Sequence, residues 1–207
     1  MSWLNDITGV TSRRKVWSEA ADTIGGTFVE GGFWDSDRLT YNHISPDKKA
    51  TWKIVLDIYS TGGKNSTTYH RITAPFISLD FLEFRMYEEN ILSPLSKKIG
   101  LQDIEIGDPK FDAKYMLKGN NERKVKILLS SQHIKDYMLK EDGLTLQIKS
   151  ASKSLFSGLP ENSYQIKYQT TTYLKSTERI THLFTLFSLI LNQLYEMKSA
   201  QGLILRD

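Results

Sequence analysis

The sequence from residue 103 to residue 129 reads Asp-Ile-Glu-Ile-Gly-Asp-Pro-Lys-Phe-Asp-Ala-Lys-Tyr-Met-Leu-Lys-Gly-Asn-Asn-Glu-Arg-Lys-Val-Lys-Ile-Leu-Leu. A turn is expected at Gly107-Asp108-Pro109, because an Asp before Pro commonly begins a turn and accepts backbone hydrogen bonds. Alternation after the turn predicts a strand, with Ala113, Tyr115 and Leu117 on one face. The stretch is therefore expected to join a β-rich front half of the chain to a helical back half.

A helix is predicted directly after this strand. Gly119-Asn120 ends the strand, and Asn120 is the expected N-cap, because its side chain can accept a hydrogen bond from a backbone amide of the first helical turn. The inner face of the helix is expected to consist of Val125, Leu128 and Leu129. Ser130-Ser131 is expected either to interrupt this helix or to begin a second helical segment.

The front half of the sequence reads as consecutive β-strands. Strands are expected over residues 27–34, 38–44, 51–59, 67–74 and 81–88, and later over residues 144–149 and 164–168. Short turns between consecutive strands favour an antiparallel meander over parallel βαβ units. Pro75 is expected to end the fourth strand or to place it at an edge, because proline donates no ladder hydrogen bond.

Helices are predicted at both ends of the chain. The first is expected to begin after Thr11 or Ser12 and to end at Gly25-Gly26, and a short helical turn is expected from Pro94 to Ile99. The longest follows Ser176, and its apolar stripe consists of Ile180, Leu183, Phe184, Phe187, Ile190, Leu191, Leu194 and Met197. The stripe favours a core helix across the sheet, with a coiled-coil or membrane-surface helix as the alternative.

These elements predict the α+β class, with a mainly antiparallel sheet packed against an N-terminal helix, a middle helix and a long C-terminal helix. The chain has 207 residues, of which 40% are hydrophobic, enough for a sizeable core. One domain spanning residues 1–207 is expected, with a subdivision near residues 90–100 as the alternative.

Composition excludes several classes of site and partner. The sequence contains no cysteine, which rules out disulfides, thiol catalysis and cysteine-based zinc sites and is consistent with the expected cytoplasmic location. The net charge is +3 and the acids and bases are interspersed, so no nucleic-acid partner is expected. The longest apolar region, residues 183–194, is too short and too polar for a transmembrane segment, and residues 1–6 do not resemble a signal peptide.

The sequence shows no catalytic motif. Gly62-Gly63-Lys64 lacks the spacing and the following helix of a phosphate-binding loop. The acidic cluster of Asp103, Glu105, Asp108 and Asp112 lacks a calcium-loop pattern, so turn formation is preferred over cation binding. No metal and no cofactor is therefore expected.

The strand that contains Tyr69, His70 and Arg71 supplies the candidate ligand-binding residues. These side chains combine an aromatic ring, an imidazole and a guanidinium, which can bind a small molecule in an aromatic-lined cavity. His43 could meet His70 across neighbouring strands. The preferred interpretation is that the histidines are partly buried or surface polar residues without a ligand.

The segment from Ile106 to Leu139 resembles a bacterial domain-of-unknown-function family. The similar pieces are the Gly107-Asp108-Pro109 turn with Phe111-Asp112, the strand around Tyr115 and the helix with Leu128-Leu129. The resemblance implies neither an activity nor catalytic residues. The expected function is a cytoplasmic binding or interaction module, with a protein partner or a second copy of the chain as the binding partner. The alternative is a small-molecule-binding protein or enzyme with an aromatic-lined cavity.

Overall fold

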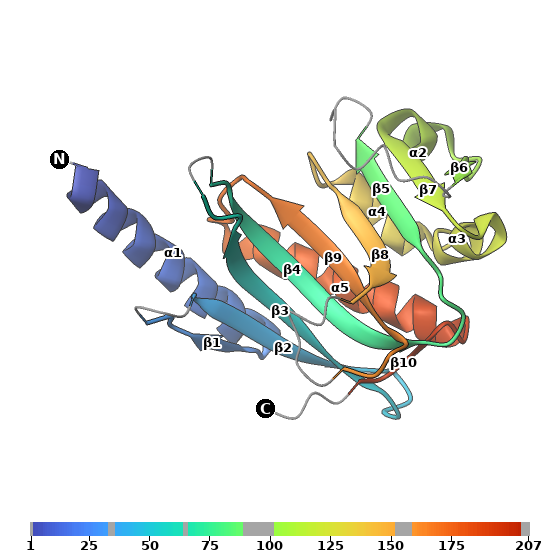
Figure 1. Cartoon of the computed structure of the whole chain (residues 1–207), viewed down its shortest axis with the longest axis horizontal. Helices are drawn as coiled ribbons and strands as arrows, with labels where there is room; N and C mark the ends of the chain where they lie inside the picture. The colour runs from blue at the N-terminus through green and yellow to red at the C-terminus, as the bar shows by residue number, and fades with distance from the viewer. Residues whose placement is uncertain (1, 33–35, 64–65, 89–101, 152–158, 204–207) are drawn as a thin grey trace.

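The protein is an α+β structure in which helices cover one face of a large antiparallel sheet (Figure 1). The computed structural model describes residues 2–32, 36–63, 66–88, 102–151 and 159–203. The predicted fold class is thereby confirmed. The predicted helical turn from Pro94 to Ile99 and the expected point of subdivision lie outside the described residues, and the single domain stays a prediction.

Ten strands of the described chain form one sheet. They are β1 (Thr27–Val29), β2 (Arg38–Ile44), β3 (Thr51–Ser60), β4 (Thr68–Ser78), β5 (Phe84–Glu88), β6 (Gln102–Ile104), β7 (Tyr115–Gly119), β8 (Leu146–Ser150), β9 (Ser163–Thr170) and β10 (Ala200–Gln201). Their order is β1-β2-β3-β4-β9-β8-β5-β7-β6, and β10 pairs with β4. The meander is confirmed for β1 to β4, whereas β9 and β8 lie between β4 and β5.

The helices of the described chain are α1 (Ser2–Ile24), α2 (Pro109–Lys114), α3 (Glu122–Leu128), α4 (Gln132–Leu139) and α5 (Thr177–Glu196). Helices α1 and α5 lie behind the sheet in Figure 1. The apolar stripe of α5 faces the sheet, and Leu183, Phe187 and Ile190 are each 0% exposed. The predicted core role is confirmed, and the alternative of a membrane-surface or coiled-coil helix is wrong because the stripe is buried. No helix of the described chain is long and apolar enough to cross a bilayer.

The stretch quoted first, residues 103–129 (the organising stretch), differs from its prediction in two places. Residues 109–114 form helix α2 because Asp108 caps it, accepting from the amides of Lys110 and Phe111, and because Pro109 suits the first helical position. The strand therefore begins only at Tyr115. The cap of α3 is Asn121, whose side chain accepts from the Lys124 amide.

Asn120, the predicted cap, has a different role. Its side chain accepts from the Glu83 amide and donates to the Phe81 carbonyl, which ties the end of β7 to the loop before β5. A Cβ at Gly119, beside it, would lie 2.9 Å from Val125 Cγ2 and 3.0 Å from Ile104 Cδ1, so a side chain there would displace these neighbours. The Gly-Asn pair thus marks a close approach of three elements.

Two other predicted boundaries are wrong. Helix α1 begins at Ser2, well before Thr11. Strand β4 continues through Pro75 to Ser78. Pairing of β4 with β3 ends at Thr73 and pairing with β10 begins at Ile77. Pro75 therefore lies in a gap of the pairing on that side of β4, while on the other side it is paired with Gln165 of β9.

Candidate functional site

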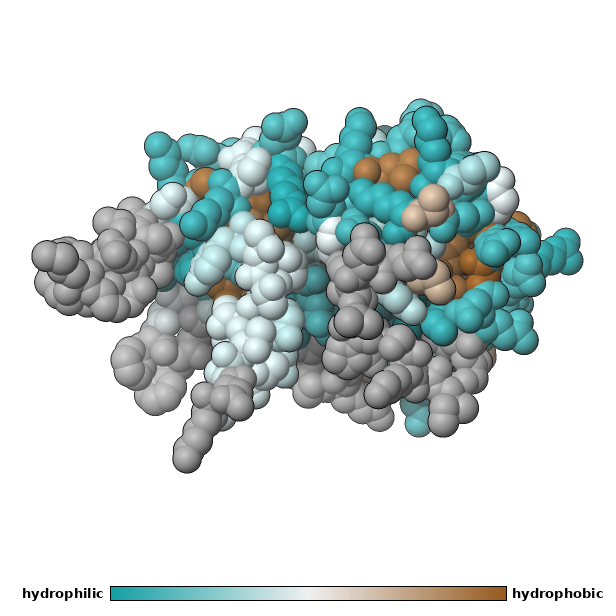
Figure 2. All heavy atoms as spheres, turned by 90° about the horizontal axis from the view of Figure 1, so that it is seen from above, coloured by the Kyte–Doolittle hydropathy of each residue, from teal (hydrophilic) through white to brown (hydrophobic). Residues whose placement is uncertain are grey.

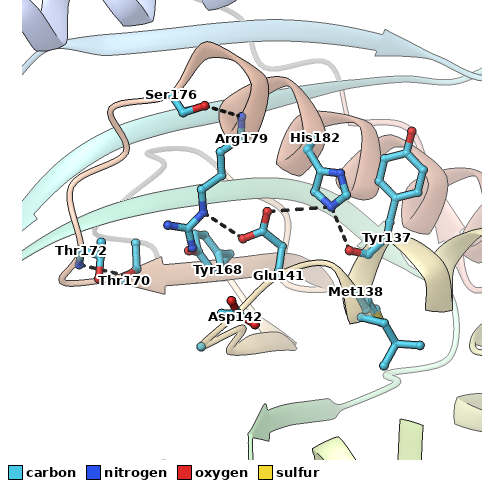
Figure 3. Close-up of polar contacts among 12 residues, drawn as sticks. Tyr137, Met138, Glu141, Asp142, Tyr168, Thr170, Thr172, Ser176, Arg179 and His182 are labelled. Atoms are coloured by element: carbon cyan, nitrogen blue, oxygen red, sulfur yellow. Dashed lines mark hydrogen bonds and ion pairs between the residues drawn. The ribbon is translucent and has the colours of Figure 1, made fainter. Parts of the chain in front are cut away.

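A cleft of about 570 Å³ opens where the end of α4 meets the beginning of α5. Its lining residues are Lys140, Glu141, Asp142, Thr172, Ser176, Glu178, Arg179 and His182. They come from the loop after α4, from the loop after β9 and from the first turns of α5. Figure 3 shows Glu141, Arg179 and His182 pointing toward one another at this place.

Local sequence explains how α5 presents its two functional side chains. Ser176 caps the helix, because its Oγ accepts from the Arg179 amide at 3.2 Å. Arg179 and His182 are three residues apart and therefore share a face of the helix. Ile180 and Leu183, each about 100° further around the helix, are fully buried. Packing of the apolar stripe thus fixes which residues reach the cleft.

Glu141 is the buried centre of the polar cluster. Its Oε2 accepts from Arg179 Nε at 2.9 Å, and its Oε1 lies 3.8 Å from His182 Nε2. The Glu141 side chain is 6% exposed and the Arg179 side chain 29% exposed. A buried carboxylate is stable only with such partners, so the ion pair is required once Glu141 is folded into this position.

Arg179 is held on two sides. Besides the Nε contact with Glu141, its Nη2 donates to the Tyr168 hydroxyl at 3.3 Å. Burial lowers the pKa of the guanidinium, but Tyr168 and Glu141 outweigh that effect and raise the pKa above its usual value. Burial also raises the pKa of Tyr168. Arg179 is therefore a fixed cation beside a neutral phenol.

His182 is held by backbone and ring contacts. Its Nε2 lies 2.8 Å from the Tyr137 carbonyl, so Nε2 carries the proton that is donated. The imidazole also stacks on the Tyr137 ring, with the centroids 4.5 Å apart. These contacts leave His182 with a defined orientation at the edge of the cleft.

Two residues of the organising stretch hold the loop after α4 by hydrogen bonds to its backbone carbonyls. Lys114 Nζ donates to the carbonyls of Leu139 and Glu141 at 3.0 and 2.8 Å. The Tyr115 hydroxyl donates to the carbonyls of Met138 and Glu141. Burial, together with nearby carboxylates, raises the pKa of Tyr115, which keeps the hydroxyl a donor. Lys114 and Tyr115 of the organising stretch thus position the loop that carries Glu141.

The cleft combines charges of both signs and has no nucleophile placed beside a free base among its lining residues. Glu141 and His182 are engaged in the contacts above, and Ser176 Oγ caps α5. Lys140, Asp142 and Glu178 are exposed around them. A charged group that enters the cleft would therefore meet side chains of both signs.

The structure separates the three predicted ligand-binding residues. Side chains alternate across a strand, so His70 lies on the helix-covered face while Tyr69 and Arg71 lie on the other face. His70 is 1% exposed and packs against Trp17 and Tyr173, with centroids 5.5 and 5.0 Å away. The three residues therefore do not form one site, and ligand binding by any of them stays a prediction.

Arg71 and His43 have defined polar partners, whereas His70 accepts one hydrogen bond, at Nδ1 from the Leu174 amide. Arg71 forms a two-bond fork with Asp57 on the neighbouring strand. His43 contacts Asn192 Oδ1 at 2.8 Å and stacks on Trp52, so it does not meet His70. Burial, with a smaller contribution from Arg13, lowers the pKa of His70 to about 4.

The acidic cluster has structural partners. Asp108 caps α2 and pairs with Lys135, and Asp112 accepts from the amides of Ile106 and Gly107. Asp103 pairs with Lys118. Asp108 accepts backbone hydrogen bonds as expected, but it does so as the N-cap of α2. Within the described residues, no group of three carboxylates or imidazoles is placed to hold a metal ion.

Sequence reasoning missed Glu141, Arg179 and His182 as a group. The detectable signal was a pair of basic side chains three residues apart in the first turns of a capped helix. Glu141 had no such signal, because it lies 38 residues from Arg179 in the sequence.

Comparison with known proteins shows a distant structural likeness. No protein-family model and no curated protein matches the sequence. The chain is similar to the crystal structure of the mycobacterial trehalose monomycolate transport factor A, TtfA, with 8% identity and a TM-score of 0.48. The match covers 88% of this chain and 93% of that chain. A likeness this weak carries no inference about ligand or function.

Proposed function

We propose that the protein is a non-catalytic interaction module that recognises a mixed-charge segment of a protein partner at the cleft between α4 and α5. The observation that carries the proposal is the fixed orientation of Arg179. Glu141 and Tyr168 hold one edge of its guanidinium, while 29% of the side chain remains open to solvent. A preoriented guanidinium loses little conformational entropy when it binds a carboxylate.

The charges around Arg179 define the partner. Lys140 adds a second cation, and Asp142 and Glu178 add two exposed carboxylates. A segment with alternating acidic and basic side chains satisfies both signs, whereas a purely acidic or purely basic segment meets repulsion.

Surface polarity also supports recognition by charge. The upper face in Figure 2 is mainly hydrophilic where it is coloured, and its hydrophobic areas are small and separate. The exposed large hydrophobic residues of the described chain are spread over several elements: Val29, Ile44, Tyr59, Leu79, Phe81, Ile127 and Tyr173. These scattered residues do not form a broad apolar docking surface, so charged side chains are the expected contacts with a partner. The proposed location is the cytoplasm, supported by the absence of cysteine.

Fluorescence anisotropy with labelled 12-residue peptides tests this function. Three peptides are compared at low salt: all acidic, all basic, and alternating Glu and Lys. The alternating peptide is expected to bind best, and Arg179→Lys is expected to weaken it about tenfold, because lysine keeps the charge but lacks the planar fork. Lys140→Glu is expected to weaken it as well. Lys49→Glu, at a highly exposed position outside the cleft, is the matched control. Equal binding of the alternating peptide by all variants would exclude the cleft.

A second candidate function is a small-molecule carrier or enzyme, and the surroundings of His70 favour it. The buried His70 Nε2 has no hydrogen-bond partner in the described structure, and two aromatic rings flank the imidazole. Native mass spectrometry of the purified protein, alone and after soaking with a metabolite mixture, tests this candidate. A bound small molecule that His70→Asn abolishes would favour it over the interaction module.

A further inference from the structure

The face of the sheet opposite α1 and α5 carries a row of polar side chains across its central strands. Ile72 of β4, Ile166 of β9 and Ile148 of β8 point into the core. Their sequence neighbours therefore point to the other face, which is the front face in Figure 1. This front face is distinct from the cleft between α4 and α5.

Strand register places Lys167 at the centre of this front face. Lys167 is paired with Thr73 on β4 and with Gln147 on β8. Directly paired residues of an antiparallel sheet have Cα atoms about 4.5–5.5 Å apart. Gln165, two residues before Lys167, projects from the same face and is paired with Lys149. Thr73, Gln147 and Gln165 are thus the nearest polar neighbours of Lys167 on this face.

Positive charge is concentrated at this point. Arg71 and Lys149 lie diagonally from Lys167 on the neighbouring strands, as the register shows. Asp57 is engaged in the fork with Arg71. Among the carboxylates of the described residues, none lies within ion-pair distance of Lys167. Burial, followed by repulsion from Lys149 and Arg71, lowers the pKa of Lys167 to about 8, and attraction to Asp57 offsets part of this effect.

A buried polar atom with no partner marks the same place. Gln165 is 1% exposed, and its Oε1 accepts no hydrogen bond within the described structure. Thr73 and Gln147 beside it are 2% and 3% exposed. Polar side chains removed from water normally have partners, so an unsatisfied acceptor in a cationic setting indicates a ligand with both an anionic oxygen and a hydroxyl.

We propose that Lys167, Arg71 and Gln165 form a binding site for a phosphate monoester on the front face of the sheet. The phosphoryl oxygens contact the Lys167 ammonium and the guanidinium of Arg71, and a hydroxyl of the ligand donates to Gln165 Oε1. A phosphate monoester supplies negative charge and several acceptors in one compact group, which matches an ammonium and a guanidinium on two neighbouring strands. Arg71, which the sequence suggested as a ligand-binding residue, belongs to this proposed site, whereas His70 lies on the other face of the sheet.

The first test is binding of glycerol 3-phosphate at pH 7, where Lys167 is mostly protonated. Isothermal titration calorimetry compares the natural protein with Lys167→Gln and with Lys49→Gln, the latter at a highly exposed control position. Lys167→Gln is expected to weaken binding at least tenfold, and Lys49→Gln to leave it unchanged. Binding of equal strength by all three proteins would overturn the proposal.

A second measurement does not depend on the stability of a variant. NMR follows the ε-carbon resonance of Lys167 through a pH titration of the natural protein, with and without saturating glycerol 3-phosphate. Bound phosphate is expected to raise the proton affinity of Lys167 at least tenfold, because it stabilises the ammonium. An unchanged titration midpoint would overturn the site at Lys167.

A vesicle co-sedimentation experiment distinguishes a lipid headgroup from a soluble metabolite as the source of the phosphate. The protein is sedimented with phosphatidylcholine vesicles that contain either no phosphatidic acid or about 10 mol% phosphatidic acid as the anionic lipid. Co-sedimentation that requires phosphatidic acid and Lys167 assigns the site to a lipid headgroup. Binding of glycerol 3-phosphate alone assigns it to a soluble metabolite. Failure of both ligands would overturn the proposal.

Discussion

Replacing Phe187 by alanine tests whether α5 is the main core element. Phe187 is 0% exposed and lies one turn after Leu183, which is also 0% exposed. A buried Phe→Ala change removes the transfer free energy of the ring and leaves a cavity, which together cost about 3–5 kcal/mol. A whole domain is typically stable by about 5–15 kcal/mol. Phe187→Ala alone is therefore expected to remove a large fraction of the unfolding free energy.

Urea denaturation, followed by circular dichroism and by tryptophan fluorescence, measures this loss. The midpoint is expected to fall without a change in the m-value, because the surface exposed on unfolding is nearly the same. For a chain of this size, 1 kcal/mol corresponds to about 2–4 °C in Tm, so a decrease of about 6–20 °C is expected. Leu183→Ala is expected to lose about 2–5 kcal/mol. The double variant is expected to deviate from additivity, because the two side chains are neighbours.

Gln193→Ala is the matched control on the same helix. Gln193 is partly exposed, and a surface substitution of this kind usually changes stability by less than about 0.5 kcal/mol. If the Tm of Phe187→Ala equals that of the natural protein, the ring is not packed in a core and the position of α5 on the sheet is wrong. An equal loss in Gln193→Ala would show that the effect is not specific to the buried face of α5, because alanine is the best helix former and does not weaken the helix by propensity.

Two further predictions concern titratable groups. Because His70 has a pKa of about 4 in the folded chain and about 6.5 when unfolded, unfolding free energy is expected to fall by up to ~3 kcal/mol from pH 6.5 to pH 4. His70→Asn keeps an acceptor for the Leu174 amide and should flatten this part of a pH–stability profile; an unaltered profile would contradict it. Glu141→Gln should lower the unfolding free energy by about 1–2 kcal/mol in urea denaturation, because Arg179 loses its counter-charge but stays partly solvated. A comparable loss in the exposed Glu178→Gln would argue against a special role for Glu141.

The sequence predicted the main elements well where local signals agreed. The Ser176 cap and the apolar stripe predicted α5, and alternation predicted β2 and β3. Prediction failed where two local signals competed. Residues 113–117 alternate like a strand, yet Asp108 and Pro109 are a helix start, and the cap determined the structure of residues 109–114.

The candidate site was less predictable than the fold. Glu141 and Arg179 lie on separate elements, and only the packing of α4 against α5 brings them within 2.9 Å. Conversely, Tyr69, His70 and Arg71 are adjacent in sequence but divide between the two faces of β4. Adjacency along a strand therefore predicted proximity that the two-residue period of side chains rules out.

By itself, the sequence determined the α+β class, the long C-terminal helix, the antiparallel meander of β1 to β4 and the absence of cysteine chemistry. These features depend on periodicity, caps and composition, which are local. Only the tertiary structure decided that β9 and β8 enter the sheet between β4 and β5. That insertion juxtaposes Lys167 with Thr73 and Gln147, and it depends on long-range strand pairing that no local pattern encodes.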